Sequence, residues 1–404
     1  MTKTVIIGGS HAAIALAARL RQLDADADIT VVSAENEYPY QRPPLSKAYM
    51  SGKSSFEQIL LRPENWYADN HIGLLRGEAI GAIDRGNKTV SMRDGRTLSY
   101  DHLVLTTGAR ARRLPQEVGG QLPNVYVMRD IGDANHLMAE MKQGRRLVVI
   151  GGGYIGLEAA SEARKKGVEV TVLEAADRIL KRVAAEETAS DIRALHRSHG
   201  VTIRENVKLD RIVDDQGHAT GVQLESGEIL PADFIITGIG VAPNTTLASD
   251  CGLAVDNGIV VDAGLRTEDP AIFAAGDCAT FPYQGRCIRL ESVQNANDQG
   301  ALIAANITGQ SLQYAPVPWF WSDQYDMKLQ IAGLNSGYDD VITRAGPREG
   351  AHSHFYFQGG TLLAADCLND AATYMLTRKI LETGKTLTKA QVADPAFVLK
   401  SVLG

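Results

Sequence analysis

Residues 147–156 read Leu-Val-Val-Ile-Gly-Gly-Gly-Tyr-Ile-Gly, and apolar positions at helical spacing follow through residue 166. An apolar strand, a glycine turn and a helix in this order are typical of a dinucleotide-binding fold. The glycines let backbone N–H groups approach a pyrophosphate, and the start of the helix supplies partial positive charge there. This stretch therefore predicts an α/β protein with a Rossmann-like domain.

The acidic residue that such a domain needs is also present. The apolar run 170–173 ends at Glu174. A carboxylate at this position hydrogen-bonds the adenosine ribose and repels a 2′-phosphate, so it favours NAD(H) over NADP(H). We predict that Glu174 and the glycine turn hold NAD.

A second, imperfect copy of the pattern opens the chain. Residues 4–13 read Thr-Val-Ile-Ile-Gly-Gly-Ser-His-Ala-Ala, so Ser10 and Ala13 stand where the second and third glycines are expected. Ser10 places a side chain where the backbone should approach the phosphates. Glu35, after the strand-like run 29–32, is the acidic candidate of this copy. Two such domains predict two nucleotides, and FAD with NADH is the economical pair because hydride transfer requires their rings to stack.

Size and composition exclude several classes of protein. The chain has 404 residues, which predicts two or three domains, and its net charge of −7 argues against a general nucleic-acid binder. No apolar run approaches the roughly 18 residues that a membrane helix requires. The four cysteines form no CxxC or CxxxxC pair, so no metal site is expected. A cytoplasmic enzyme is the expectation.

Several further segments support a family resemblance. The segments are Pro39-Tyr-Gln-Arg-Pro-Pro-Leu-Ser-Lys47, the strand-and-turn runs 103–109 and 234–244, the run 269–278 ending in Gly-Asp-Cys, and Pro318-Trp-Phe-Trp-Ser-Asp-Gln324. Together they resemble the flavoprotein reductases of the glutathione-reductase fold. They are most similar to the NADH-dependent ferredoxin reductases that serve cytochromes P450 and Rieske ring-hydroxylating dioxygenases.

The resemblance implies a three-domain architecture. A discontinuous FAD-binding domain would comprise residues 1–112 and 245–321, and an NAD-binding domain would comprise residues 113–244. An α+β C-terminal domain would follow at residues 322–404. The segment 110–120, which is rich in Arg, Pro and Gly, supports the first boundary.

Three residues are implied as catalytic. An ammonium at Lys47 near flavin N5 would favour the negative charge of the reduced flavin. Glu158, two residues after the last glycine of the 151–156 turn, would pair with Lys47 across the domain boundary. Trp319 and Trp321 alternate around Phe320, which predicts that both indoles lie on one face of a strand. Trp321 would lie near the isoalloxazine on the acceptor side, with domain-interface packing as the alternative.

The resemblance also implies two sets of cofactor-binding residues. Asp277 would accept a hydrogen bond from a ribityl hydroxyl, and a helix opening near Arg289 and running through Asn306 would aim its N-terminus at the flavin. The FAD set is Gly8, Ser10, His11, Ala12, Ala13, Glu35, Arg42, Pro43, Lys47, Ile80, Thr107, Gly108, Arg129, Asp277, Glu291 and Val293. The NAD set is Gly151, Gly153, Tyr154, Ile155, Gly156, Glu158, Glu174, Gly238, Ile239 and Gly240. Tyr154 either covers the flavin until nicotinamide displaces it or serves packing.

The positions of the cysteines restrict which kind of electron acceptor the flavin can serve. Disulfide reductases of this fold need two cysteines beside the flavin, and NADH oxidases and peroxidases need one early in the FAD domain. This chain has no cysteine before Cys251, and Cys278 is expected to face the core. Both of these chemistries lose their key group, and the resemblance implies that electrons leave singly for an iron–sulfur protein.

The implied partner is a small acidic [2Fe–2S] ferredoxin that docks transiently and feeds a P450 or Rieske oxygenase, with the reductase a monomer or weak dimer. A net-negative reductase must offer such a partner a local positive patch. Its candidate residues are Arg110, Arg112, Arg113, Arg289, Lys328, Arg344, Arg378 and Lys379. A rubredoxin reductase and an NADH-sensing protein resembling apoptosis-inducing factor are the alternatives.

Overall fold

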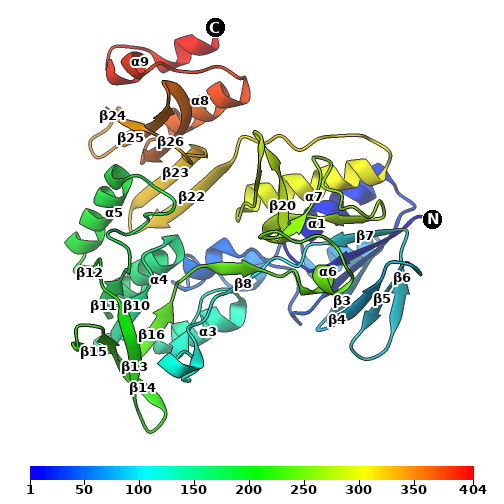
Figure 1. Ribbon diagram of the computed structural model, residues 1–404, viewed down its shortest axis with the longest axis horizontal. Helices are drawn as coiled ribbons and strands as arrows, with labels where there is room; N and C mark the ends of the chain where they lie inside the picture. Colours follow the sequence, from blue (N-terminus) through cyan, green and yellow to red (C-terminus); the bar gives the residue numbers. More distant parts are fainter. The chain divides into compact units, whose positions relative to one another are not determined.

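The computed structural model describes residues 1–404, which divide into two compact units (Figure 1). The first unit comprises Met1–Gln41, Ser54–Arg110 and Val241–Pro316, and the second comprises Arg42–Lys53, Ala111–Gly240 and Val317–Gly404. Residues 42–53, expected in the FAD-binding domain, therefore belong to the second unit. The division into three domains stays a prediction.

The first unit is built around a parallel five-stranded sheet of order β19-β7-β1-β2-β3. Strand β1 is buried almost throughout, because a parallel sheet is covered on both faces and its strands are continuously apolar. The strands are β1 Lys3–Ile7, β2 Asp28–Ser33, β3 Ile72–Arg76, β7 His102–Leu105 and β19 Ile272–Ala274.

Helices α1 (His11–Leu23) and α7 (Val293–Ile307) lie side by side on this sheet (Figure 1). They approach closely at Gly300, where an added Cβ would lie 2.4 Å from the carbonyl oxygen of Ala12. The glycine thus lets two helix backbones come nearer than side chains would allow. This contact fixes the two helix starts relative to each other.

Smaller elements complete the first unit. Strands β4-β5-β6 and β18-β20-β21 form two three-stranded sheets. The bounds are η2 Glu57–Ile59, α2 Glu64–Asp69, β4 Ile80–Asp84, β5 Thr89–Met92, β6 Thr97–Ser99, β17 Val241–Pro243, α6 Thr246–Asp250, β18 Ile259–Val260, η4 Gly276–Cys278, β20 Ala279–Tyr283 and β21 Arg286–Ile288. Short strand β8 (Ala109–Ala111) follows β7 in the chain.

The second unit holds another parallel sheet, of order β12-β11-β10-β16-β9, and an antiparallel sheet β13-β14-β15. Helix α4 follows β10 directly, as the glycine pattern predicts. The bounds are η1 Pro43–Ser46, η3 Gln116–Val118, β9 Val125–Tyr126, α3 Ile131–Glu140, β10 Arg146–Ile150, α4 Tyr154–Lys165, β11 Glu169–Leu173, α5 Glu186–Ser198, β12 Thr202–Arg204, β13 Leu209–Asp215, β14 His218–Leu224, β15 Ile229–Pro231 and β16 Phe234–Thr237.

The C-terminal part of the second unit is an antiparallel sheet of order β22-β23-β26-β25-β24 with helices after it. Its core side buries Phe355 and Phe357 among side chains of α8 and the last turn. The bounds are β22 Trp319–Gln324, β23 Met327–Gly333, β24 Asp340–Ala345, β25 His352–Gln358, β26 Thr361–Leu368, α8 Ala371–Glu382, α9 Lys389–Ala393 and η5 Leu399–Leu403. No helix in the chain combines the length and the hydropathy needed to cross a membrane.

Candidate functional site

The first glycine turn joins β1 to α1. Gly8 has a φ of +114°, and an added Cβ would lie 2.1 Å from the carbonyl oxygen of Thr106. The Oγ of Ser10 lies 3.3 Å from Nδ1 of His11, the first residue of α1. The Ser10 side chain forms no capping bond with the helix. The first turn of α1 therefore keeps N–H groups that no capping side chain satisfies.

Two more of the predicted FAD-binding residues, Thr107 and Gly108, lie directly after β7 in the first unit. The Thr107 hydroxyl donates to the carbonyl of Asn244 at 2.6 Å, and the Asn244 amide donates back to the carbonyl of Thr107 at 2.9 Å. Gly108 has a φ of +65° and accepts the backbone N–H of Asn244. The two predicted turn residues are thus tied to the return of the chain after residue 240.

Helix α7 begins at Val293, and not near Arg289 as expected. The Ser292 hydroxyl caps it by accepting the backbone N–H of Asn295 at 3.2 Å. Arg289 lies before the helix, where its guanidinium pairs with Glu291 at 2.6 Å and donates to the carbonyl of Asp277 at 3.0 Å. The ion pair and the hydrogen bond of Arg289 therefore both lie inside the first unit.

Two other predicted flavin residues lie in the first unit. Glu35 accepts the hydroxyl of Tyr40 at 2.5 Å, just after β2. Ile80 opens β4 with its side chain in the core of the unit. Cys278 is fully buried, as the sequence predicts, and burial raises the pKa of its thiol.

The second glycine turn, between β10 and α4, is also closely packed. An added Cβ on Gly151 would lie 2.4 Å from the carbonyl oxygen of Gly238, and one on Gly156 would lie 2.4 Å from that of Gly151. Side chains are therefore excluded at both positions. At Gly153 a Cβ would meet nothing within 4 Å, so the turn is open on this side. Helix α4 also lacks a capping side chain.

Glu174 lies beside this turn at the end of β11. One carboxylate oxygen accepts the backbone N–H of Gly152 at 2.8 Å, and the other accepts that of Ala176 at 2.8 Å. Glu174 therefore holds the turn as well as presenting charge to it. Two isoleucines of the predicted NAD set are exposed although apolar, Ile155 at 44% and Ile239 at 37%.

Lys47 and Glu158 form an ion pair within the second unit. The Nζ of Lys47 lies 2.6 Å from Oε2 of Glu158, with Glu158 1% exposed and Lys47 17% exposed. The hydroxyl of Ser46 donates to the same oxygen at 2.6 Å, and that of Ser322 donates to Oε1 at 2.7 Å. The buried carboxylate is thus satisfied by three donors, which offsets the cost of removing it from water.

The network continues to residues that sequence reasoning missed. Gln324 donates to the Ser322 hydroxyl at 3.1 Å, and its oxygen lies 2.7 Å from Nε2 of His196 on α5. Burial lowers the pKa of His196 to about 4, so the ring is neutral and Nε2 carries the proton donated to Gln324. The spacing of Ser322 and Gln324, two residues apart on β22, was the available signal, because such residues share one face of a strand.

Aromatic residues line the start of α4 and strand β22. The ring centroids of Tyr154 and Phe320 lie 5.2 Å apart, and the Tyr154 hydroxyl is buried. This environment supports packing as the role of Tyr154 in this state. The indoles of Trp319 and Trp321 lie 5.7 Å apart, which confirms that they share a face.

Two arginines predicted for the flavin lie together in the second unit. The guanidinium of Arg42 donates to the carbonyl of Arg129 at 3.1 Å. The N–H of Arg129 is held by Asp133 at 2.8 Å. The proline-stiffened segment 42–47 thus brings Arg42 and Lys47 to the same unit as the NAD turn.

The candidate docking cations divide into two groups. Arg344 donates to carbonyls of the C-terminal segment, including that of Asp394 at 2.7 Å and that of Phe397 at 2.8 Å, so it clasps this segment. Arg289 is engaged as described above, and both of these arginines are only partly exposed. The exposed candidates are Arg110, Arg112, Arg113, Lys328 and Lys379, with Arg378 partly exposed and paired with Glu382.

Both turns fit a dinucleotide. Each unit presents positive-φ glycine backbone at the end of a parallel strand, followed by a helix start without a capping side chain, and these are the groups that a pyrophosphate contacts. The acid after the second strand is present in each unit, as Glu35 and Glu174. The residues present therefore suit two nucleotide cofactors.

Comparison with known proteins agrees with this geometry. Residues 2–300 match the family of pyridine nucleotide-disulphide oxidoreductases, and residues 319–403 match the reductase C-terminal family. The chain is 45% identical to rhodocoxin reductase of Rhodococcus erythropolis over 98% of this chain and 93% of that protein. It is 40% identical to the ferredoxin–NAD(+) reductase component of the anthranilate 1,2-dioxygenase system of Burkholderia cepacia, over 99% of this chain and 98% of that protein.

A solved structure matches over the whole chain. It is that of the covalent putidaredoxin reductase–putidaredoxin complex, with a TM-score of 0.96, 40% identity, and coverage of 100% of this chain and 98% of that one. The predicted α/β fold and family are confirmed. The chain is an oxidoreductase that uses FAD and NAD(H), and it belongs to the pyridine nucleotide-disulphide oxidoreductase family.

Proposed function

We propose that this chain is an NADH-dependent ferredoxin reductase that passes electrons through FAD, one at a time, to a [2Fe–2S] ferredoxin serving a P450 or Rieske oxygenase. The observation that carries the proposal is the state of the cysteines in a family named for disulphide chemistry. All four are free, and none lies in residues 1–250. The electrons therefore leave for an acceptor outside the chain.

FAD held here would supply hydride acceptance from NADH and one-electron release to the acceptor. The chain contributes electrostatics to this exchange. Lys47 holds a fixed positive charge, because Glu158 accepts its N–H at 2.6 Å and is itself held by Ser46 and Ser322. A cation fixed in a partly dry site stabilises developing negative charge without reorganisation. We assign Lys47 and Glu158 to the nicotinamide side, and Trp321 to the acceptor side.

The remaining predicted residues bind the two nucleotides. Gly8, the start of α1 and the start of α7 at Val293 suit the FAD, with Asp277 toward its ribityl chain. Glu174 selects NADH, because its carboxylate repels a 2′-phosphate at the glycine turn. Ile155 and Ile239, exposed apolar side chains beside that turn, suit an apolar ring. Four free cysteines suit the reducing cytoplasm, where we place the enzyme.

The test is NADH-driven cytochrome c reduction by the purified flavoprotein, with and without a [2Fe–2S] ferredoxin. We expect a rate that depends strongly on the ferredoxin and is lost when NADPH replaces NADH. Rubredoxin is assayed in parallel. A flavin that NADH reduces, but that oxidised rubredoxin and not oxidised ferredoxin reoxidises, would contradict the assigned partner.

A further inference from the structure

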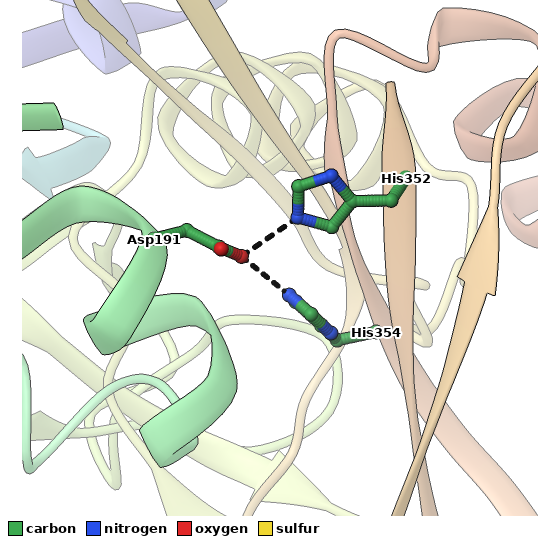
Figure 2. Close-up of side chains that lie close together, drawn as sticks. All are labelled: Asp191, His352 and His354. Carbon is green, nitrogen blue, oxygen red and sulfur yellow. Dashed lines mark hydrogen bonds and ion pairs between the residues drawn. The ribbon is translucent and has the colours of Figure 1, made fainter. Parts of the chain in front are cut away.

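Three side chains with metal-ligand chemistry converge outside the nucleotide site. Asp191 comes from α5, and His352 and His354 come from alternate positions of β25 (Figure 2). The Nε2 atom of His352 lies 2.7 Å from Oδ2 of Asp191, and that of His354 lies 2.8 Å from the same oxygen. The candidate ligand atoms all lie within 4.8 Å of one another.

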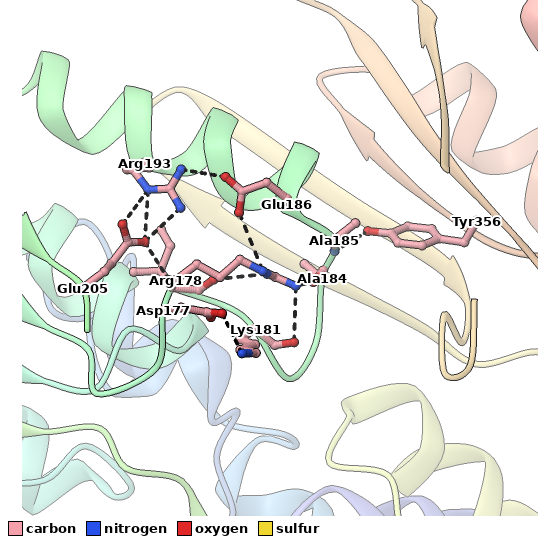
Figure 3. Close-up of polar contacts among 10 residues, drawn as sticks. Asp177, Arg178, Lys181, Ala184, Ala185, Glu186, Arg193, Glu205 and Tyr356 are labelled. Atoms are coloured by element: carbon pink, nitrogen blue, oxygen red, sulfur yellow. Dashed lines mark hydrogen bonds and ion pairs between the residues drawn. The ribbon is translucent and has the colours of Figure 1, made fainter. Parts of the chain in front are cut away.

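The fold presents these residues together for a physical reason. Side chains two residues apart on a strand share a face, so His352, His354 and Tyr356 all point from β25 toward α5. The start of α5 is anchored to the same face, because the Ala185 N–H donates to the Tyr356 hydroxyl at 3.0 Å (Figure 3). Asp191 follows on the same helix. The site therefore stands on a helix and a strand, and not on a mobile loop.

A further contact holds the His354 ring in orientation. The Nδ1 atom of His354 lies 2.9 Å from the hydroxyl of Thr343, which is directly opposite on β24. Histidines that bind metals ordinarily have the second ring nitrogen held in this way, which directs the free lone pair to the ion.

The charges and the exposure of the cluster also suit a cation. Two further carboxylates, Asp366 and Asp370, act electrostatically on the His354 and His352 rings. His354 is buried, whereas His352 is 26% exposed and Asp191 34% exposed. One side of the cluster is therefore open to water, so a fourth ligand position is accessible.

We propose that Asp191, His352 and His354 form a binding site for a borderline divalent ion of the zinc class, with water as the fourth ligand. Two imidazole nitrogens and one carboxylate oxygen are a ligand set that Zn²⁺ takes in tetrahedral geometry. Ligand atoms around such an ion lie roughly 3.3 Å apart. The carboxylate must therefore withdraw by about 0.5 Å from each nitrogen. The two ring nitrogens, which lie within 4.8 Å of each other, must adopt the same separation. The ion would bridge α5 to β25.

The test is calorimetric titration of the holoprotein, stripped of metals with EDTA, with Zn²⁺ at pH 7.5. We expect one Zn²⁺ per chain, with a melting temperature that rises with Zn²⁺ and not with Mg²⁺. His352→Gln and His354→Gln should each weaken binding by tenfold or more. Affinity should also fall at pH 5.5, because protons compete for the ring nitrogens.

Two matched variants guard against other zinc ligands. His218→Gln removes an exposed histidine, and Cys287→Ser removes the exposed thiol, so both should bind Zn²⁺ as the unaltered chain does. Flavin absorbance reports that each variant is folded. Equal binding by the unaltered chain and His352→Gln, or binding lost in Cys287→Ser, would overturn the proposal. So would a melting temperature that responds to pH but not to Zn²⁺, which would identify a proton-mediated ion pair.

Discussion

At the scale of the residue, the Lys47 ammonium is the group whose charge we assign to the reaction. Replacing it in Lys47→Met should slow reduction of the flavin by NADH by about tenfold to a hundredfold, because a fixed charge at the reacting centre is lost. Stopped-flow absorbance under anaerobic conditions measures this step with FAD still bound. Ser46 and Ser322 continue to satisfy Glu158, so the variant should fold.

The matched control is Lys53→Met, which removes an exposed lysine of the same segment. NADH should reduce the flavin of this variant at the normal rate. A Lys47→Met protein that is also reduced at the normal rate would show that the Lys47–Glu158 pair is structural only.

At the scale of the element, helix α5 reaches the C-terminal sheet through a buried neutral histidine, His196. Burial lowers its pKa to about 4 from the ordinary value of 6.5, so the unfolded chain takes up a proton first as the pH falls. The contribution of neutral His196 to the free energy of unfolding is therefore complete above pH 6.5 and is lost between about pH 6.5 and 4. The loss amounts to at most about 3 kcal/mol.

Melting temperatures from pH 7.5 to 4.5 test this expectation. The His196→Gln variant keeps a donor for Gln324 and should lose less stability across this range than the unaltered chain. His218→Gln, at an exposed histidine, should follow the unaltered chain. Parallel pH profiles for all three proteins would contradict a buried neutral His196.

At the scale of the whole molecule, the net charge of −7 opposes an acidic partner, so docking depends on a local excess of positive charge. The ferredoxin-dependent rate should therefore fall severalfold between about 20 and 300 mM salt, since salt screens such attraction. Charge reversal at an exposed candidate residue, tested as Arg113→Glu and Lys328→Glu, should lower this rate and flatten its salt dependence.

Lys142→Glu reverses an exposed lysine outside the candidate set and is the control for the change in net charge. The rate of flavin reduction by NADH, measured separately, should change little from that of the unaltered chain in all three variants. A ferredoxin-dependent rate that does not change with salt would exclude electrostatic docking.

Local sequence determined the two nucleotide-binding motifs. A strand, a tight glycine turn and a helix are specified by residues close in sequence, so Gly8, Gly151 and Gly156 were identifiable from their spacing alone. The shared face of Trp319 and Trp321 followed from strand periodicity in the same way. The family resemblance followed from further local segments, above all residues 39–47 and 318–324.

Only the tertiary structure decided which distant residues meet. Glu158 is satisfied by Ser46 and Ser322, more than 100 residues away in each direction, and no periodicity encodes that encounter. Arg344, expected at the surface, clasps the C-terminal segment because neighbouring carbonyls need donors. Asp191 meets His352 and His354 because helix packing, and not sequence spacing, brings a helix face against alternate residues of a strand.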